Sequence, residues 1–136
     1  RKTYSHEFGH LFVGLADEYV GGTEMSDLYF PGVEPWEANI TTLTNLDAKT
    51  WGRLLPAEVR EKNTDRTGWG LNPQNPASPD FNPKKPWALG IYEGGGYLSK
   101  GIYRPTDVCR MRNNTAERFC PVCERAIEKV ILHQAR

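Results

Sequence analysis

The sequence predicts a single α+β domain, built mainly from helices and long irregular loops. Apolar residues recur at helical spacing near both ends of the chain, in residues 4–15 and 119–133. Residues 91–103 contain short alternating stretches, which are typical of extended strands. The 136 residues include 13 Gly and 10 Pro, so much of the remaining chain must form turns and loops.

The first predicted helix spans residues 4–15. Thr3 or Ser5 is suited to cap its start, and Gly14 interrupts the apolar pattern near its end. Its period is defined by the apolar positions Tyr4, Phe8, Leu11, Phe12 and Leu15.

The middle of the chain predicts little regular structure. A second helix is expected near residues 47–62, where Pro56 interrupts it. Residues 63–90 are rich in Pro and Asn and predict a surface loop. No second core follows this loop, so we expect residues 1–136 to belong to one domain.

The last predicted helix spans residues 119–133. Pro121 suits its first turn, where the N–H that Pro lacks would have no partner within the helix. The apolar face consists of Phe119, Val122, Cys123, Ala126, Ile127, Val130 and Ile131.

Charge and hydropathy exclude two classes of partner. Lys and Arg number 17 and Asp and Glu number 17, so the net charge is zero. A general nucleic-acid binder needs a surplus of Lys and Arg to displace counterions from phosphates. No apolar run approaches the roughly 20 residues that span a bilayer. We therefore expect neither a nucleic-acid partner nor a membrane span.

The segment His6-Glu7-Phe8-Gly9-His10 has the spacing of a metal site. Two His at positions i and i+4 of a helix lie about 6 Å apart along the axis on one face, so both can reach one ion. Zinc fits such an open site best. Glu7 lies beside the ion and can take a proton from a metal-bound water and pass it to a leaving amine. The alternative is an ordinary surface helix, although Gly9 inside a helix costs about 1 kcal/mol and implies a packing or site requirement.

A third protein ligand is needed, and Asp17 is the preferred choice. On a straight helix Asp17 would lie about 10.5 Å beyond His10, too far to share an ion. Gly14 can adopt a positive φ, end the helix and let the chain turn back. Glu18 is the competing ligand, or a partner that holds a ligand His in place. His133 is expected to lie on the surface of the last helix.

The three cysteines, Cys109, Cys120 and Cys123, leave several roles open. The C-x-x-C at 120–123 is compatible with a redox pair, with half of a zinc site or with plain burial. A bridge from Cys109 to Cys120 would connect the segment around 109 to the last helix, and free thiols are the alternative. A structural zinc site would need a fourth ligand, such as His133.

Residues 6–19, HEFGHLFVGLADEY, resemble the active-site signature of the IgA-peptidase family, the metzincin-type zinc metallopeptidases also called igalysins. The general metzincin motif is H-E-x-x-H-x-x-G-x-x-H. This chain departs from it, because Gly14 follows His10 by four positions and Asp17 stands where a third His would be expected. The IgA-peptidase signature includes both departures.

Further segments are similar to the family in the same order. Under this resemblance Met111 is the Met of a Met-turn near 109–113, an apolar floor beneath the metal, and Asn39 is a structural residue. Tyr97 and Tyr103 precede this turn and are candidates to contact the scissile carbonyl or its oxyanion, although packing is the preferred role for Tyr103. Asn113 stands where several metzincins carry a Tyr. The similar segments are 34–42, Trp51, 94–97, 101–105, 109–112 and 119–123.

The resemblance implies a zinc-dependent peptidase, an endopeptidase in preference to an exopeptidase, acting on proteins or peptides outside the cell or at its surface. One Zn²⁺ would be held by His6, His10 and Asp17, with Glu7 as general base and then acid. The alternative is an inactive, metal-containing module that binds a protein or glycan, which would have no need of Glu7. The resemblance also implies a metzincin-like zincin fold. Because only residues 1–5 precede His6, we expect a partial catalytic domain without its N-terminal sheet subdomain.

Overall fold

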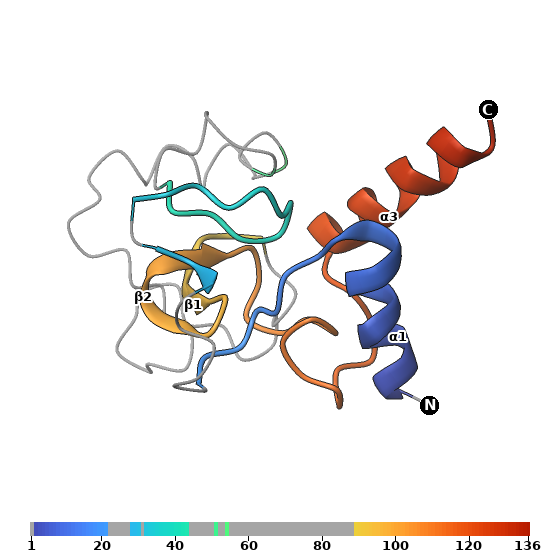
Figure 1. Ribbon diagram of the computed structural model, residues 1–136. Coiled ribbons are helices and arrows are strands. Elements are labelled where there is room, and N and C mark those ends of the chain that lie inside the picture. The colour runs from blue at the N-terminus through green and yellow to red at the C-terminus, as the bar shows by residue number, and fades with distance from the viewer. Residues whose placement is uncertain (1, 22–27, 31, 44–50, 52–53, 55–88) are drawn as a thin grey trace.

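A computed structural model describes residues 2–21, 28–30, 32–43, 51, 54 and 89–136. Figure 1 shows the helical segments together on one side of the molecule and a β-hairpin on the other, which confirms the α+β class. The predicted helix at 47–62 and the predicted loop at 63–90 fall almost entirely outside the described residues. The elements are α1 (Lys2–Phe8), η1 (Gly9–Val13), β1 (Tyr92–Gly95), β2 (Leu98–Arg104) and α3 (Pro121–Gln134).

The predicted first helix is present, but its winding changes along its length. The α-helix α1 continues directly into η1, which is a π-helix, and the helical segment ends at Val13. The predicted end at Leu15 is therefore wrong. Gly14 ends the helix with φ +70°, and its N–H donates to the His10 carbonyl at 3.0 Å. This left-handed glycine confirms the predicted reversal of the chain.

Strands β1 and β2 confirm the extended pieces predicted at 91–103. They pair antiparallel, with Tyr92 opposite Arg104 and Gly95 opposite Leu98. Gly96 and Tyr97 form the turn between them, with φ values of +53° and +69°. Two successive positive φ values match the two-residue hairpin turn whose twist suits paired strands. Tyr97 is an unusual residue for this conformation, so its side chain or backbone must be held by its surroundings.

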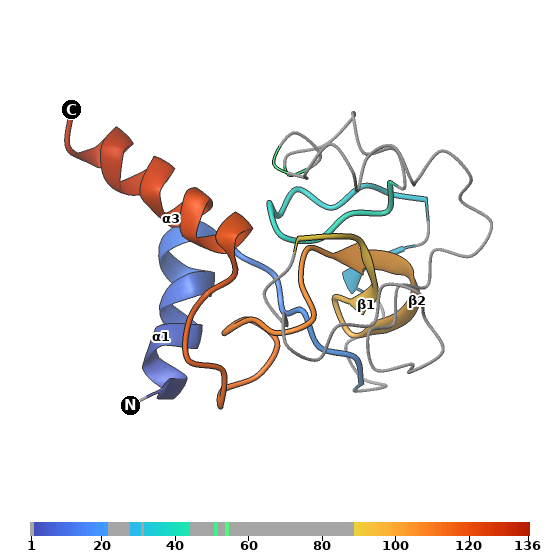
Figure 2. The ribbon, with the colours of Figure 1, turned by 180° about the vertical axis from the view of Figure 1, so that it is seen from behind.

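An extended segment at residues 15–20 connects the helical half to the hairpin (Figure 2). On one side the Glu18 N–H donates to the Met111 carbonyl at 2.9 Å. On the other side the Gly96 N–H donates to the Asp17 carbonyl at 2.8 Å, and the Tyr97 N–H donates to the Tyr19 carbonyl at 3.0 Å. The segment is thus fixed between the hairpin and the turn that contains Met111.

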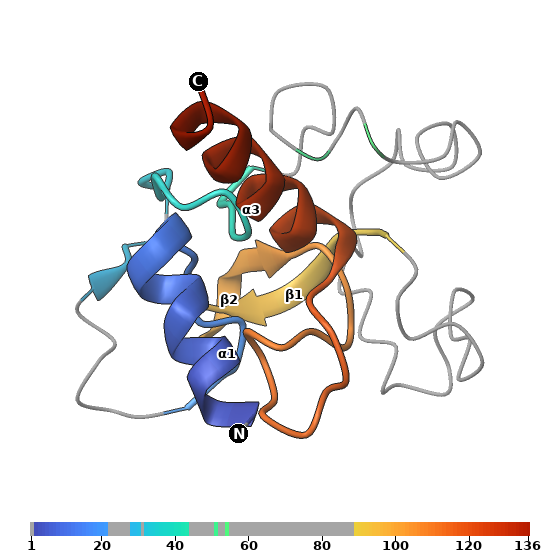
Figure 3. The ribbon, with the colours of Figure 1, turned by 90° about the vertical axis from the view of Figure 1, so that its right-hand side faces the viewer.

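Helix α3 packs against η1 and begins with Pro121 in its first turn, as predicted (Figure 3). Only the first half of its apolar face is buried, at Val122, Cys123 and Ala126, whereas Ile131 is 51% exposed. His133 is exposed, which confirms its predicted surface position. No helix within the described ranges has the length and apolar character needed to cross a membrane.

Gly9 lies directly above Met111, and this contact explains the glycine inside the helix. Met111 is fully buried in a tight turn, where the Arg112 and Asn113 N–H groups both donate to the Cys109 carbonyl. A Cβ atom added at Gly9 would lie 2.6 Å from the Met111 sulfur. The helix and the turn therefore approach each other as closely as they do because residue 9 has no side chain.

Asn39 joins the extended segment to the loop at 32–43. Its side-chain oxygen accepts the Ala16 N–H at 2.8 Å, and its amide nitrogen donates to the Ala16 carbonyl at 2.8 Å and to Glu18 Oε1 at 3.0 Å. The side chain is fully buried. These contacts confirm Asn39 as a structural residue and leave it inaccessible to modification.

The substitution Gly9→Ala should destabilise the protein, although replacing Gly by Ala inside a helix usually increases the free energy of unfolding by about 1 kcal/mol. The buried Met111 side chain cannot move into solvent to avoid the new methyl group. We expect the free energy of unfolding to fall by about 1–3 kcal/mol in urea denaturation at a fixed zinc concentration. In the Gly9→Ala/Met111→Ala double variant, the loss in the free energy of unfolding should be smaller than the sum of the losses in the two single variants. A Gly9→Ala protein as stable as the wild type would contradict the contact.

The substitution Asn39→Asp should destabilise the protein because Asp cannot donate to the Ala16 carbonyl and adds a charge beside Glu18. We expect the free energy of unfolding to fall by about 2–3 kcal/mol. The matched control is Asn113→Asp. Asn113 is exposed, and its side-chain oxygen, which Asp retains, accepts from the Thr115 N–H and hydroxyl, so the free energy of unfolding should change by no more than about 0.5 kcal/mol. Equal losses in the two variants would contradict the role given to Asn39.

Candidate metal centre

His6, His10 and Asp17 meet at one point, as the sequence predicted. His6 Nε2 lies 2.9 Å from Asp17 Oδ1, and His10 Nε2 lies 3.2 Å from the same oxygen. The two Nε2 atoms are 3.0 Å apart. In a tetrahedral zinc site with bonds of about 2.0–2.1 Å, neighbouring ligand atoms lie about 3.3 Å apart. The three side chains are therefore arranged closely enough to share one ion.

The hydrogen bonds on the far side of each imidazole determine which nitrogen carries the proton. His6 Nδ1 lies 2.9 Å from the Arg110 carbonyl, and His10 Nδ1 lies 2.6 Å from the Leu15 carbonyl. A carbonyl only accepts, so each Nδ1 must carry a hydrogen, and in a neutral ring Nε2 then presents a lone pair. Two such lone pairs and the buried Asp17 Oδ1 repel one another unless a cation lies among them. This donor set fits a metal ion.

Tyr97 holds the second oxygen of Asp17. Its hydroxyl donates to Asp17 Oδ2 from the turn of the hairpin, while the backbone at Tyr97 and Gly96 bonds to residues 19 and 17. Burial, followed by the hydrogen bond and the charge of Asp17, raises the pKa of Tyr97 well above its ordinary value. The hydroxyl therefore keeps its proton and remains a donor. The sequence placed Tyr97 near the site but did not identify it as the partner of Asp17.

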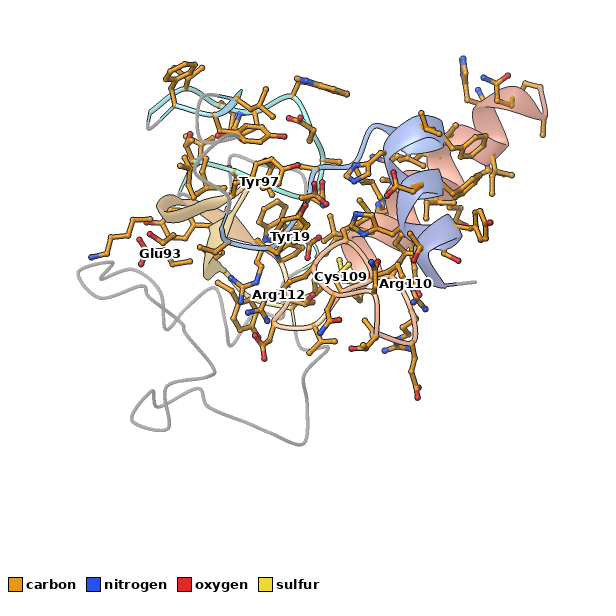
Figure 4. The ribbon with its side chains drawn as sticks, turned by 60° about the horizontal axis from the view of Figure 1, so that its bottom comes forward. Tyr19, Glu93, Tyr97, Cys109, Arg110 and Arg112 are labelled. Carbon is orange, nitrogen blue, oxygen red and sulfur yellow. The ribbon has the colours of Figure 1, made fainter. Side chains whose placement is uncertain are left out.

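Tyr19 is a site residue that sequence reasoning missed. Its ring packs edge-on against Tyr97 at 5.3 Å between centroids, and the two tyrosines lie together in Figure 4. Burial and then the charge of Asp17 raise the pKa of Tyr19, and Glu7 adds to the rise, so both acids lie near its hydroxyl. Glu7 itself is exposed, on α1 beside His6. In the sequence, the only indication that Tyr19 belongs to the site was its position directly after Asp17-Glu18.

Met111 and Tyr103 occupy different surroundings. Met111 lies under Gly9, next to the Arg110 carbonyl that holds His6, as expected for a residue beneath the site. Tyr103 lies in β2, pairs through its backbone with Thr41, and packs against the main hydrophobic cluster. Within the described ranges no contact joins Tyr103 to His6, His10 or Asp17.

Glu18 groups with the three cysteines and not with His6 and His10, so the structure does not favour Glu18 as the competing third ligand. Neighbouring side chains in an extended segment point to opposite sides, and the Asp17 side chain points toward the imidazoles. Glu18 is fully buried, and burial, with repulsion from Cys120, raises its pKa well above the usual range. Its Oε1 accepts from Asn39, and the Cys123 sulfur lies 3.4 Å away.

The three cysteines gather around Glu18 as free, fully buried thiols. The structure agrees with the free-thiol alternative and has no Cys109–Cys120 bridge. The Cys109 and Cys123 sulfurs lie 3.7 Å apart. Burial raises the pKa of the Cys109 and Cys123 thiols. Burial acts in the same direction on Cys120, but donors from Cys109, Cys123 and the backbone of Val122 and Cys123 outweigh it and lower its pKa.

Comparison with known proteins identifies the family of the chain. A search of curated proteins finds no match. The family model described as IgA Peptidase M64 matches residues 2–65 and 80–131, which include all three residues of the His–His–Asp site and the three cysteines. The match covers most of the sequence and supports the resemblance of residues 6–19. The chain therefore belongs to the IgA peptidase M64 family, a family of peptidases.

Proposed function

We propose that the chain is the zinc-dependent catalytic part of an endopeptidase, with one Zn²⁺ held by His6, His10 and Asp17. The observation that carries the proposal is the convergence of three metal-binding atoms within 3.2 Å of one another, beside Glu7. Membership of a peptidase family supplies the reaction class. The buried carboxylate and the two oriented imidazoles supply the site.

When bound, zinc supplies Lewis acidity, which polarises the peptide carbonyl and lowers the pKa of water. The remaining work belongs to side chains of this chain. Glu7 follows His6 on the helix and is exposed, so its carboxylate can take a proton from the attacking water and return it to the leaving amine. The Arg110 and Leu15 carbonyls keep both imidazoles in the orientation that the metal needs.

We assign the carbonyl contact to Tyr19 in preference to Tyr103. Tyr19 is 36% exposed and lies beside Asp17, whereas Tyr103 packs against the core. A raised pKa keeps the Tyr19 hydroxyl protonated and able to donate to a developing oxyanion. A Tyr19→Phe variant with unchanged kcat and KM would rule out this assignment.

We also propose that the complete catalytic domain includes a sheet packed over the active-site helix. Large apolar side chains on α1 and η1 are exposed in the described chain, with Tyr4 at 79% and Leu11 at 89%. A structure of the natural full-length protein in which both remain exposed would contradict it.

The family description names an extracellular antibody, so we propose action outside the cell or at its surface. The named substrate itself does not transfer with the fold, and the substrate class proposed here is a protein or peptide. Absence of the natural protein from the culture medium and from the cell surface would contradict this location.

The substitution Glu7→Gln should abolish catalysis while leaving metal binding intact, because Glu7 handles protons and is not placed as a ligand. We expect kcat for casein cleavage by the natural full-length protein to fall at least about 10²-fold, with zinc content unchanged. The matched control is Glu128→Gln on the exposed face of α3, which should retain full activity. Activity that survives Glu7→Gln would sink the proposed mechanism.

The substitution Tyr97→Phe should weaken metal binding because it removes the hydroxyl that holds Asp17 Oδ2. We expect the zinc Kd of the His–His–Asp site to rise about 10–100-fold, measured by competition with a chromophoric chelator. Tyr4→Phe, at an exposed position on α1, is the control and should leave the Kd unchanged. An unaltered zinc Kd in Tyr97→Phe would show that Asp17 is positioned without the Tyr97 hydroxyl.

A further inference from the structure

We propose that Glu18, Cys109, Cys120 and Cys123 form a second, structural zinc site. It uses none of the residues of the His–His–Asp site and goes beyond the peptidase function. The four side chains come from the extended segment, the turn at 109–113 and the start of α3. The sequence suggested His133 as the fourth ligand of such a site, but that residue lies exposed on α3.

The separations between the four donor atoms match a tetrahedral site. Zinc–sulfur bonds of about 2.3 Å place two sulfurs about 3.8 Å apart, and a sulfur and a carboxylate oxygen about 3.6 Å apart. The Cys109 and Cys123 sulfurs are 3.7 Å apart. Glu18 Oε1 lies 3.4 Å from the Cys123 sulfur and 4.0 Å from that of Cys120. All four donor atoms lie within 4.8 Å of one another.

The backbone around Cys120 is arranged to accept negative sulfur. Cys120 occupies the N-cap of α3, and Pro121 begins the helix. The first N–H groups of a helix point toward a residue at this position and favour a thiolate there. The Cys120 N–H itself donates to the Cys109 sulfur at 3.2 Å. This backbone donor, together with the partial positive charge at the start of α3, would stabilise the deprotonated cysteines that a metal requires.

Complete burial argues against the other roles of these cysteines. Glu18 and all three cysteines are 0% exposed, and among the described residues Glu18 Oε2 has no hydrogen-bond partner. A redox pair needs access to its reaction partner, which full burial denies. A disulfide would require the sulfurs to close from 3.7 Å to about 2.05 Å and would leave one thiol beside a buried carboxylate. A divalent cation compensates the carboxylate and the thiolates together.

A metal in this site would connect the two clusters through adjacent residues. Asp17 and Glu18 are neighbours on the extended segment and face opposite sides. An ion on Glu18 would tie this segment to the turn that carries Arg110 and Met111, and so would fix Asp17 and His6 relative to each other. Its role is that of a cross-link between segments far apart in the sequence.

Cobalt substitution of the full chain separates the two sites. Cobalt bound to cysteine sulfur gives a charge-transfer absorption in the near ultraviolet, which a His–His–Asp site cannot give. We expect wild-type protein to bind about two Zn²⁺ per chain and, with Co²⁺, to show this absorption. The variant His6→Ala/His10→Ala should lose about one ion and keep the absorption. Failure of the proposed catalytic site alone would leave the absorption unchanged.

The variants Cys123→Ser and Glu18→Gln test the ligands directly. Cys123→Ser should lose about one Zn²⁺, weaken the absorption and lower Tm by at least about 5 °C. Glu18→Gln can still accept from Asn39, and it should shift the cobalt spectrum and release metal more readily. If Cys123→Ser does not fold, alkylation of the wild type decides: the thiols should resist modification until a chelator is added. Wild-type protein without the absorption, or with an intact mass lower by about 2 Da from a disulfide, would overturn the proposal.

Discussion

The structure depends on how the extended segment at Asp17-Glu18 is held. Its backbone bonds to the Met111 carbonyl on one side and to Gly96 and Tyr97 on the other. Because neighbouring side chains alternate, this single attachment directs one carboxylate toward the imidazoles and the next toward the cysteines. Both candidate metal sites therefore depend on the same few backbone hydrogen bonds.

The remaining contacts keep the helix at a defined distance from this segment. Gly9 allows the helix to rest on Met111, and the carbonyl of Arg110, in the same turn, accepts from His6. Gly14 then reverses the chain so that Leu15 can accept from His10. Each imidazole is thus oriented by a backbone group before any metal binds, which reduces the conformational entropy lost on binding.

The strained turn at Tyr97 belongs to the same arrangement. A non-glycine residue at φ +69° is unfavourable by itself, and it persists because its hydroxyl, N–H and carbonyl all have partners in residues 17–21. The hairpin thereby contributes to the site only through residues that hold Asp17.

Arg104 stabilises the strands of the hairpin by donating to the Glu93 and Gly94 carbonyls. Burial, with repulsion from Arg112, lowers the pKa of Arg104 only to about 10, so the guanidinium stays charged.

The sequence by itself determined the features that depend on short spacing: the helical face shared by His6 and His10, the reversal at Gly14, and the approach of Asp17 to the two imidazoles. These follow from the helical period and from the left-handed conformation open to glycine. The tertiary structure alone decided that Tyr97 holds Asp17, that Glu18 belongs with the cysteines, and that the first helix ends in a π-helix. Tyr97 and Asp17 are 80 positions apart, and Glu18 and Cys123 are 105 apart. No local period encodes such contacts, because they exist only once the hairpin, the turn and α3 pack against one extended segment.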